Sequence, residues 1–336
     1  MQNRHPSVLS QTGPDFAAHV PADGYAWWYL DATSDCGRHG VTVIVMLGCV
    51  FSPWYAAARR RGPTDPLDHS AINVALYGAA GHRWALTERG RADVRRDATT
   101  LAIGPSAVRW EQDALTIDVD EVTSPWPSRL RGSIVLRPRH IGQRAYVLDA
   151  NGRHLWMPIA TSCPIELNFS SPQLKWRGTA YLDANEGSAP LETDFDSWHW
   201  SRASRNGRSV IFYDTYWHRS DGAHNDGPDR AAPDRAIALA VDADGNQEHI
   251  LAPPLRTLPR TRWGIDRRTR CDDDARPELL ETLENGPFYA RSLVGNVIGG
   301  EAWTAFHESV SLKRFAARWV QTLLPVKLPR HVLRRD

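Results

Sequence analysis

Alternation of apolar and polar residues with a period of two constrains this chain of 336 residues more than any other feature. It runs through residues 108–122, returns in 129–138, and continues in 236–250, where Asp244-Gly245 marks a hairpin turn. Alternate side chains of a strand point to opposite faces, so this pattern is typical of strands with one buried face. Long amphipathic helical patterns are scarce before residue 308. The sequence therefore predicts an all-β fold, either a sandwich or a barrel.

Charge and motif content exclude several classes of function. There are 40 Lys and Arg against 39 Asp and Glu, so no strong field attracts nucleic acid, and we expect no nucleic-acid partner. The four cysteines form no CxxC pair, and the thirteen histidines lack the spacing of metal ligands. Walker A, GxGxxG, HExxH and GxSxG motifs are absent. We therefore expect no catalytic metal.

One uncharged stretch has nearly the length of a membrane span. Residues 41–58 carry no charge, which is close to the lower limit for a transmembrane helix. The stretch begins with β-branched residues, contains Gly48 and is interrupted at Ser52-Pro53. We predict a buried strand over 41–51 followed by a loop, with a transmembrane helix as the alternative. The first sixteen residues lack an apolar core, so no signal peptide is expected.

The length suggests two domains or one large one. The polar segment 184–194 is a candidate connection between two halves. We expect an N-terminal extension, two β domains and a basic tail, with the limits 1–20, 21–187, 188–308 and 309–336. Oligomeric state cannot be inferred from the sequence.

The C-terminal segment differs from the rest in its periodicity and charge. Leu312, Phe315, Trp319 and Leu323 follow helical spacing, and residues 309–335 contain seven Lys or Arg and no acidic residue. A basic amphipathic helix with aromatic residues is suited to an anionic membrane surface. The alternative is a helix packed on the protein, followed by a solvated basic end.

Two short patterns carry candidate catalytic residues. His154 and Trp156 are two residues apart in HLWMP, and Tyr181 and Asp183 are two apart in YLD. On strands, each pair shares a face, which in a barrel could be the lumen. Such a site would combine a proton donor, a polar partner and aromatic faces. From the residues alone, the alternative is an interior histidine, packed aromatic rings and an aspartate capping a turn at 185–187.

Several longer segments identify a family. They are GYAWWYLDA (24–32), VFSPWYAAARRRGPTDPLDHSAINVALYG (50–78), RWALTERGR (83–91), HLWMPIA (154–160), GTAYLDANEG (178–187), FDSWHWSR (195–202) and LENGPFYARS (283–292). With these segments the chain resembles the carotenoid 1,2-hydratases, or hydroxyneurosporene synthases, of phototrophic bacteria. The resemblance covers roughly residues 20–330.

The resemblance implies two lipocalin-like β-barrel domains with a C-terminal amphipathic helix. It also implies a hydro-lyase that adds water to the terminal 1,2 double bond of an acyclic carotene such as neurosporene or lycopene, without a cofactor or a metal. Relatives of the same fold include cyclases, so a cofactor-free cyclase and a carrier of hydrophobic ligands remain alternatives. Because the substrate dissolves in membranes, we expect peripheral association with the cytoplasmic side of the inner or photosynthetic membrane.

The resemblance also implies roles for the four candidate residues. Asp183 is the expected proton donor, because an apolar pocket keeps a carboxyl group protonated until substrate arrives. Tyr181 and Trp156 would face the carbocation with their rings, an effect of about 0.5–2 kcal/mol each. His154 would bind Asp183 or orient the attacking water.

Overall fold

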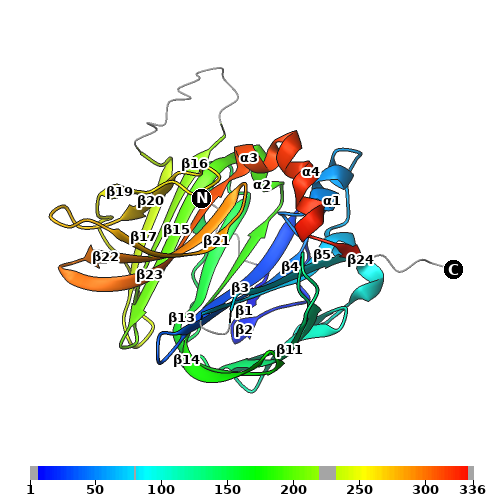
Figure 1. Ribbon diagram of the computed structural model, residues 1–336, viewed down its shortest axis with the longest axis horizontal. Helices are drawn as coiled ribbons and strands as arrows, with labels where there is room; N and C mark the ends of the chain where they lie inside the picture. The colour runs from blue at the N-terminus through cyan, green and yellow to red at the C-terminus, as the bar shows by residue number, and fades with distance from the viewer. Residues whose placement is uncertain (1–6, 79–80, 219–231, 332–336) are drawn as a thin grey trace. The chain divides into compact units, whose positions relative to one another are not determined.

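The computed structural model describes residues 7–78, 81–218 and 232–331, and strands dominate it (Figure 1). These residues divide into two compact units. Unit 1 contains the described residues within Met1–Val147, Gly152–Pro190 and Thr322–Asp336, and unit 2 contains those within Leu148–Asn151 and Leu191–Gln321. The domain limits expected from the sequence stay a prediction.

Unit 1 is built on one large antiparallel sheet that includes thirteen of the described strands. A path through twelve of them follows the order β24 (Arg330–His331), β6 (Arg83–Arg89), β5 (Ser70–Gly78), β4 (His39–Leu47), β3 (Tyr25–Ser34), β14 (Gln173–Gly187), β13 (His154–Ser171), β11 (Arg129–Leu136), β10 (Ala114–Val122), β9 (Ser106–Glu111), β8 (Thr100–Ile103) and β7 (Val94–Arg96). Strand β12 (Tyr146–Val147) pairs with β13, and β24 pairs in parallel with β6. The sheet curls, since the backbone N–H of Ser124, just after β10, donates to the carbonyl oxygen of Trp84 in β6 at 3.0 Å.

Short elements complete unit 1. They are β1 (Leu9–Ser10), β2 (Gly13–Pro14), α1 (Pro53–Arg59), and the 3-10 turns η1 (Pro66–His69) and η2 (Arg91–Asp93). The uncharged stretch 41–51 lies largely in β4, which confirms the predicted strand. Helix α1 then begins where a loop was expected, because the Ser52 hydroxyl caps it by accepting from the N–H groups of Trp54 and Tyr55. Among the described residues, no helix is long and apolar enough to cross a membrane.

The stretch 108–122 is two strands, and the prediction of one continuous strand is wrong. β9 and β10 pair as a hairpin through Gln112 and Asp113, which adopt φ of +51° and +59°. Left-handed backbone at both turn positions fits a tight hairpin. Both strands turn their apolar residues toward the same core, Val108 and Trp110 before the turn and Leu115 and Ile117 after it, so the alternation changes phase at the turn.

The core of unit 1 lies on one face of this sheet. Side chains from the three neighbouring strands β3, β14 and β13 alternate into it, namely Ala26, Trp28, Leu30, Ala32, Ala180, Leu182, Ala184, Leu155, Met157 and Ile159. Val8 and Phe16, from the expected extension, are also in this core. The intervening side chains of the three strands therefore point to the opposite face of the sheet.

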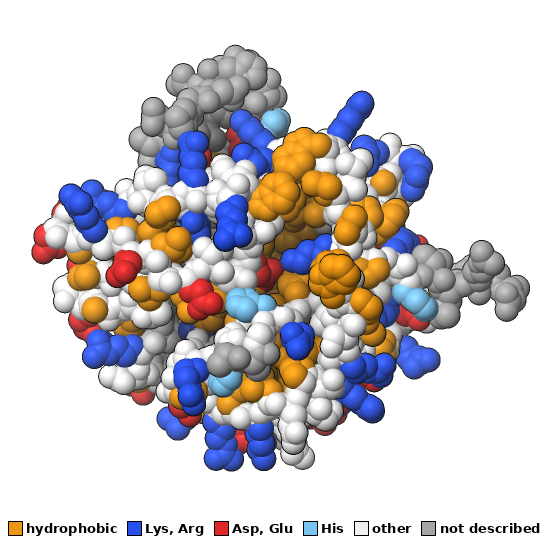
Figure 2. Space-filling model, viewed as in Figure 1, with side chains coloured by type: hydrophobic (Ala, Val, Ile, Leu, Met, Phe, Trp, Pro, Cys, Tyr) orange, Lys and Arg blue, Asp and Glu red, His pale blue; other side chains and the backbone are white. Residues whose placement is uncertain are grey.

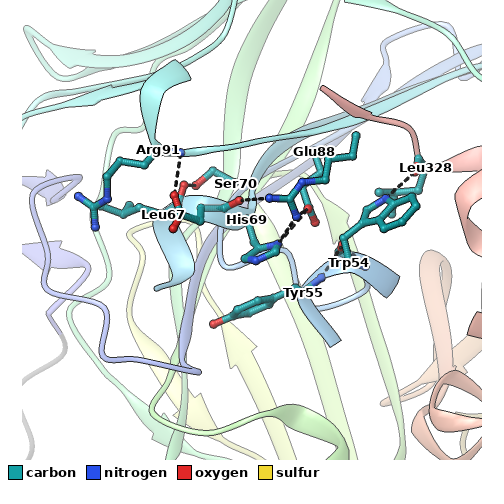
Figure 3. Close-up of polar contacts among 11 residues, drawn as sticks. Trp54, Tyr55, Leu67, His69, Ser70, Glu88, Arg91 and Leu328 are labelled. Atoms are coloured by element: carbon teal, nitrogen blue, oxygen red, sulfur yellow. Dashed lines mark hydrogen bonds and ion pairs between the residues drawn. The ribbon is translucent and has the colours of Figure 1, made fainter. Parts of the chain in front are cut away.

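A buried ion-pair cluster anchors β24 to β6. The Glu88 carboxylate accepts from the Arg330 guanidinium at 2.5 Å and lies 2.9 Å from Nδ1 of His69, while Tyr55 stacks on the His69 ring with centroids 4.8 Å apart (Figure 3). The carbonyl oxygen of Leu328, just before β24, accepts from the indole N–H of Trp54 at 3.3 Å. Charge and hydrogen bonds thus hold β24 and the residues just before it against β6 and α1.

Unit 2 contains a second antiparallel sheet. Its strand order is β18 (Gln247–His249), β17 (Arg235–Val241), β16 (Arg208–Trp217), β15 (Phe195–Arg205), β23 (Glu301–Ser311), β22 (Tyr289–Ile298) and β21 (Glu278–Asn285). A two-stranded sheet of β19 (Leu255–Leu258) and β20 (Arg267–Arg270) and the short helix α2 (Leu191–Asp194) accompany it. The predicted turn between β17 and β18 is confirmed: Gly245 has φ +82°, and the Asp242 carboxylate accepts from the N–H groups of Asp244 and Asn246.

Two helices replace the single C-terminal helix that the spacing predicts. α3 (Leu312–Ala316) and α4 (Arg318–Lys327) are separated by Ala317, whose ψ of 133° is extended. The break rotates the apolar face, so Trp319 and Leu323 are 46% and 44% exposed. The buried apolar residues of this segment are Leu312, Phe315, Val320, Leu324 and Leu328.

Two buried histidines lie side by side in unit 2. The rings of His199 on β15 and His307 on β23 stack with centroids 6.1 Å apart. His199 Nδ1 lies 3.0 Å from the Ser309 hydroxyl, and His307 Nε2 lies 2.8 Å from the carbonyl oxygen of Arg268. Burial lowers the pKa of His307 to about 4 and holds the pKa of His199 well below its ordinary value. Both rings are therefore neutral near pH 7.

This pair predicts acid sensitivity of unit 2. A histidine with a lowered pKa in the folded state binds its proton more readily when unfolded, so stability falls as pH drops from about 6.5 toward 4. His307 alone contributes a loss of about 3 kcal/mol across that window. Urea unfolding at a series of pH values measures it, and His307→Gln should flatten the profile. An equally steep profile in the variant would assign the acid sensitivity to other groups.

Candidate active site

The four predicted residues lie on the adjacent strands β13 and β14. In their antiparallel register, His154 is opposite Gly187, and Trp156 is opposite Asn185. Directly opposite residues point to the same face, as do Tyr181 and Asp183, two residues apart. This face is opposite to the hydrophobic core of unit 1, which the intervening side chains of the same strands fill. Of the two faces that the sequence left open, the four residues therefore lie on the one that points away from this core.

Asp183 is the centre of the site. Its Oδ2 atom accepts from the Tyr181 hydroxyl at 2.7 Å and from the indole N–H of Trp156 at 2.8 Å. All three side chains are buried, and Asp183 is 4% exposed. The structure thus brings these three predicted residues together, although Trp156 contributes its N–H edge where a ring face was expected. Two donors on one oxygen stabilise the carboxylate that remains after the proton has left.

His154 lies further along β13, and its Nδ1 is 3.0 Å from the Tyr25 hydroxyl. Gly187 makes this contact possible, since a Cβ there would lie 2.3 Å from the Tyr25 ring and 2.7 Å from His154 Nδ1. Strand β14 continues through Gly187, so the reading of 185–187 as a turn capped by Asp183 is wrong. Because Gly187 has no side chain, the Tyr25 and His154 rings can pack directly against the backbone of β14.

Two residues missed in the sequence complete this face. Tyr29 and Asp31 on β3 are opposite Asp183 and Tyr181, respectively. The Tyr29 hydroxyl donates to Asp31 Oδ2 at 3.0 Å, and the Tyr29 and Tyr181 rings meet edge to face with centroids 6.2 Å apart. Asp31 is fully buried. The signal was available, because the tetrapeptide YLDA occurs both at 29–32 and at 181–184.

Among the described residues, no three His, Cys, Asp or Glu side chains are grouped so that they could hold a metal ion. The chemistry that the site offers is proton transfer. It combines buried carboxyl groups, phenols that hydrogen-bond to them, and aromatic walls.

Solved structures with the same architecture define the fold class. A putative AttH from Nitrosomonas europaea aligns with a TM-score of 0.56 at 16% identity, covering 91% of this chain and 99% of that one. Kievitone hydratase from Nectria haematococca aligns with a TM-score of 0.52 at 9% identity, covering 94% and 96%. The mostly β, lipocalin-like fold predicted from the resemblance is confirmed.

Sequence comparison defines the family within that fold. The model of the carotenoid hydratase CrtC family matches residues 43–335. The acyclic carotenoid 1,2-hydratase of Thiocapsa roseopersicina is 47% identical over 319 residues, covering 95% of this chain and 76% of the relative. That of Cereibacter sphaeroides is 36% identical over 289 residues, covering 86% and 98%. The chain belongs to the carotenoid hydratase family, and the predicted resemblance is confirmed.

Proposed function

We propose that this chain is a hydro-lyase that adds water to the terminal C1–C2 double bond of acyclic carotenes such as neurosporene and lycopene. The observation that carries the proposal is the buried Asp183 carboxyl group, with two donors on one oxygen, in a chain whose relatives are named for this reaction. The product is a 1-hydroxy carotenoid.

The first step is protonation of the alkene. Asp183 donates its proton to C2, the less substituted carbon, and C1 becomes a tertiary carbocation. Because Oδ2 already accepts two hydrogen bonds, the transferred proton is best carried on Oδ1. Tyr181 and Trp156 stabilise the carboxylate that forms, at the moment when charge develops on it. Nearby aromatic faces favour the cation.

The second step is capture of the cation by water. The water oxygen bonds to C1, and one water proton passes to a base. The hydrogen bond to Tyr25 holds His154 at the edge of this site, where its ring can orient a polar group. No step of this mechanism uses a metal or a cofactor.

Mass analysis tests the proposed reaction against its alternatives. The protein is incubated with neurosporene and with lycopene in detergent micelles, and the carotenoids are extracted. Hydration adds the mass of one water, cyclisation leaves the mass unchanged, and a carrier returns the substrate itself. A product of unchanged mass, or no product from either carotene, would overturn the assignment.

We also propose that the protein associates peripherally with the membrane, on the cytoplasmic side of the inner or photosynthetic membrane. Hydrophobic side chains gather over the C-terminal helices, with Lys and Arg side chains around them (Figure 2). On α4, the exposed residues Trp319, Leu323 and Val326 accompany Arg318 and Lys327. Apolar side chains flanked by positive charge suit an anionic lipid surface, from which the enzyme would take one end of a carotene.

Replacing these side chains tests the membrane proposal without disturbing buried residues. In the triple variant Trp319→Ser, Leu323→Ser and Val326→Ser, co-sedimentation with anionic lipid vesicles should fall at least tenfold. Each replacement removes apolar side-chain area that the native protein would bury in the lipid surface. Leu251→Ser, at a residue 94% exposed, is the matched control and should sediment as the native protein does. Equal sedimentation of the triple variant and the control would refute the role of α4.

A further inference from the structure

A second phenol–carboxyl pair mirrors the first across the β3–β14 pairing. The two YLDA segments run antiparallel, with Leu30 opposite Leu182 at their centre. In each segment the tyrosine hydroxyl donates to the aspartate two residues later, at 3.0 Å for Asp31 and 2.7 Å for Asp183. The local arrangement is therefore a pseudo-twofold pair, with both carboxyl groups on one buried face.

Two buried polar groups beside these carboxyl groups have no hydrogen-bond partner among the described residues. Thr42 on β4 is directly opposite Asp31, and its hydroxyl is fully buried. Asn185, two residues beyond Asp183 on the same face, has an unpartnered side-chain N–H₂ group and is 2% exposed. Buried polar atoms of this kind are usually satisfied by water. The face is therefore equipped to bind a water molecule on either side of the carboxyl pair.

We propose that Asp31 is the general base that deprotonates the attacking water, an inference that rests on the proposed hydratase function. Asp183 gives its proton to C2. A water held by Thr42 then bonds through its oxygen to C1, and its proton passes to the Asp31 carboxylate. The net result is H on C2 and OH on C1. Before the next turnover, the proton returns from Asp31 to Asp183 through water, which restores both groups.

The spacing of the two carboxyl groups suits this division of roles. Asp31 and Asp183 are diagonal neighbours across antiparallel strands, which places their Cα atoms about 7–8 Å apart. Both side chains are on the same face of the sheet, so one bound group can lie against both carboxyl groups, as in enzymes in which one carboxyl group protonates the substrate and the other activates a water. Two negative charges buried on one face repel each other, which favours the state in which only one of the two groups is ionised. One group is then an acid and the other a base.

The experiment separates proton donation from water capture. Asp31→Asn, Asp183→Asn and the native protein are incubated with lycopene in D₂O. Asp31→Asn should lower hydration at least 100-fold. Its uncaptured cation loses a proton instead: loss of the original hydrogen from C2 returns lycopene that carries deuterium at C2, and loss from a methyl group on C1 gives a deuterated isomer with a terminal methylidene group. Azide, which needs no base, should then yield an azide adduct with Asp31→Asn. Asp183→Asn should give neither deuterium nor adduct.

Further variants keep the result interpretable. Tyr29→Phe removes only the hydroxyl group that donates to Asp31. It should lower hydration by a smaller factor than Asp31→Asn does, and it should retain deuterium incorporation. This variant tests the role of Asp31 even if Asp31→Asn does not fold. Asp118→Asn, at the half-exposed carboxylate paired with Arg109 on β9, is the matched control and should react as the native protein does.

Full hydration by a folded Asp31→Asn, or loss of deuterium incorporation together with hydration, would overturn the role of Asp31. By contrast, failure of the native protein to hydrate any acyclic carotene would refute the proposed function itself.

Discussion

Asp183→Asn should abolish hydration while leaving the fold and carotene binding intact. The amide has nearly the same shape as the carboxyl group, and its oxygen can still accept from Tyr181 and Trp156, but it has no acidic proton to give. General acid catalysis typically contributes 10²–10⁴-fold. An alkene is a very poor base and depends on this one donor, so we expect kcat/KM to fall by about 10³-fold or more. Product formation by mass and binding by carotenoid absorbance measure the two effects separately.

Two milder variants refine this prediction. Tyr181→Phe and Trp156→Phe each remove one donor from the carboxylate that forms in the reaction. A hydrogen bond to a charged group contributes about 1.5–3 kcal/mol, so each variant should lose roughly 10- to 100-fold in kcat with little change in binding. If Asp183→Asn retained activity near that of the native protein, the proton would have to come from another group, and the assignment of the acid would be wrong.

The sequence predicts which residues of the site share a face of the sheet, but it does not predict which face that is. The i, i+2 spacing placed His154 with Trp156 and Tyr181 with Asp183, and the strands confirm that each pair shares a face. Spacing could not say which face is the core. Strand β3 has large apolar residues on both faces, as in the run AWWYL, because both of its faces are buried. Alternation is informative only where one face meets water.

The repeated tetrapeptide YLDA marks Asp31 and Asp183 as similar residues, but it does not say that they lie side by side. The two YLDA segments are about 150 positions apart in the chain and meet only because β3 pairs with β14. A similar limit explains the C-terminal helices. Helical spacing through Leu312, Phe315 and Trp319 assumes an uninterrupted helix, and the extended Ala317 breaks that phase. Asp31 was missed because strand pairing brings together residues that are distant in sequence. The single C-terminal helix was predicted because one extended residue is not visible in the spacing of apolar residues.

The largest stability effect is expected at the anchor of the C-terminal strand. Arg330→Met removes the cation that faces the fully buried Glu88 carboxylate and leaves the negative charge beside His69 (Figure 3). Breaking a buried ion pair by removing one partner typically costs 3–5 kcal/mol, because the remaining charge stays desolvated. We therefore expect the free energy of unfolding of unit 1 to fall by about 3 kcal/mol or more in urea titrations.

Companion variants assign this loss to the buried charge. Arg91→Met breaks the ion pair of Arg91 with Asp65, whose side chains are 53% and 41% exposed, and should cost at most about 1 kcal/mol. The double variant Arg330→Met with Glu88→Gln removes both charges and should recover a large part of the loss. Exchange of the Glu88 amide hydrogen, which bonds to the Pro329 carbonyl oxygen at 3.0 Å, should accelerate in Arg330→Met as β24 detaches. A loss in Arg330→Met no larger than in Arg91→Met would show that Glu88 is not desolvated in the folded protein.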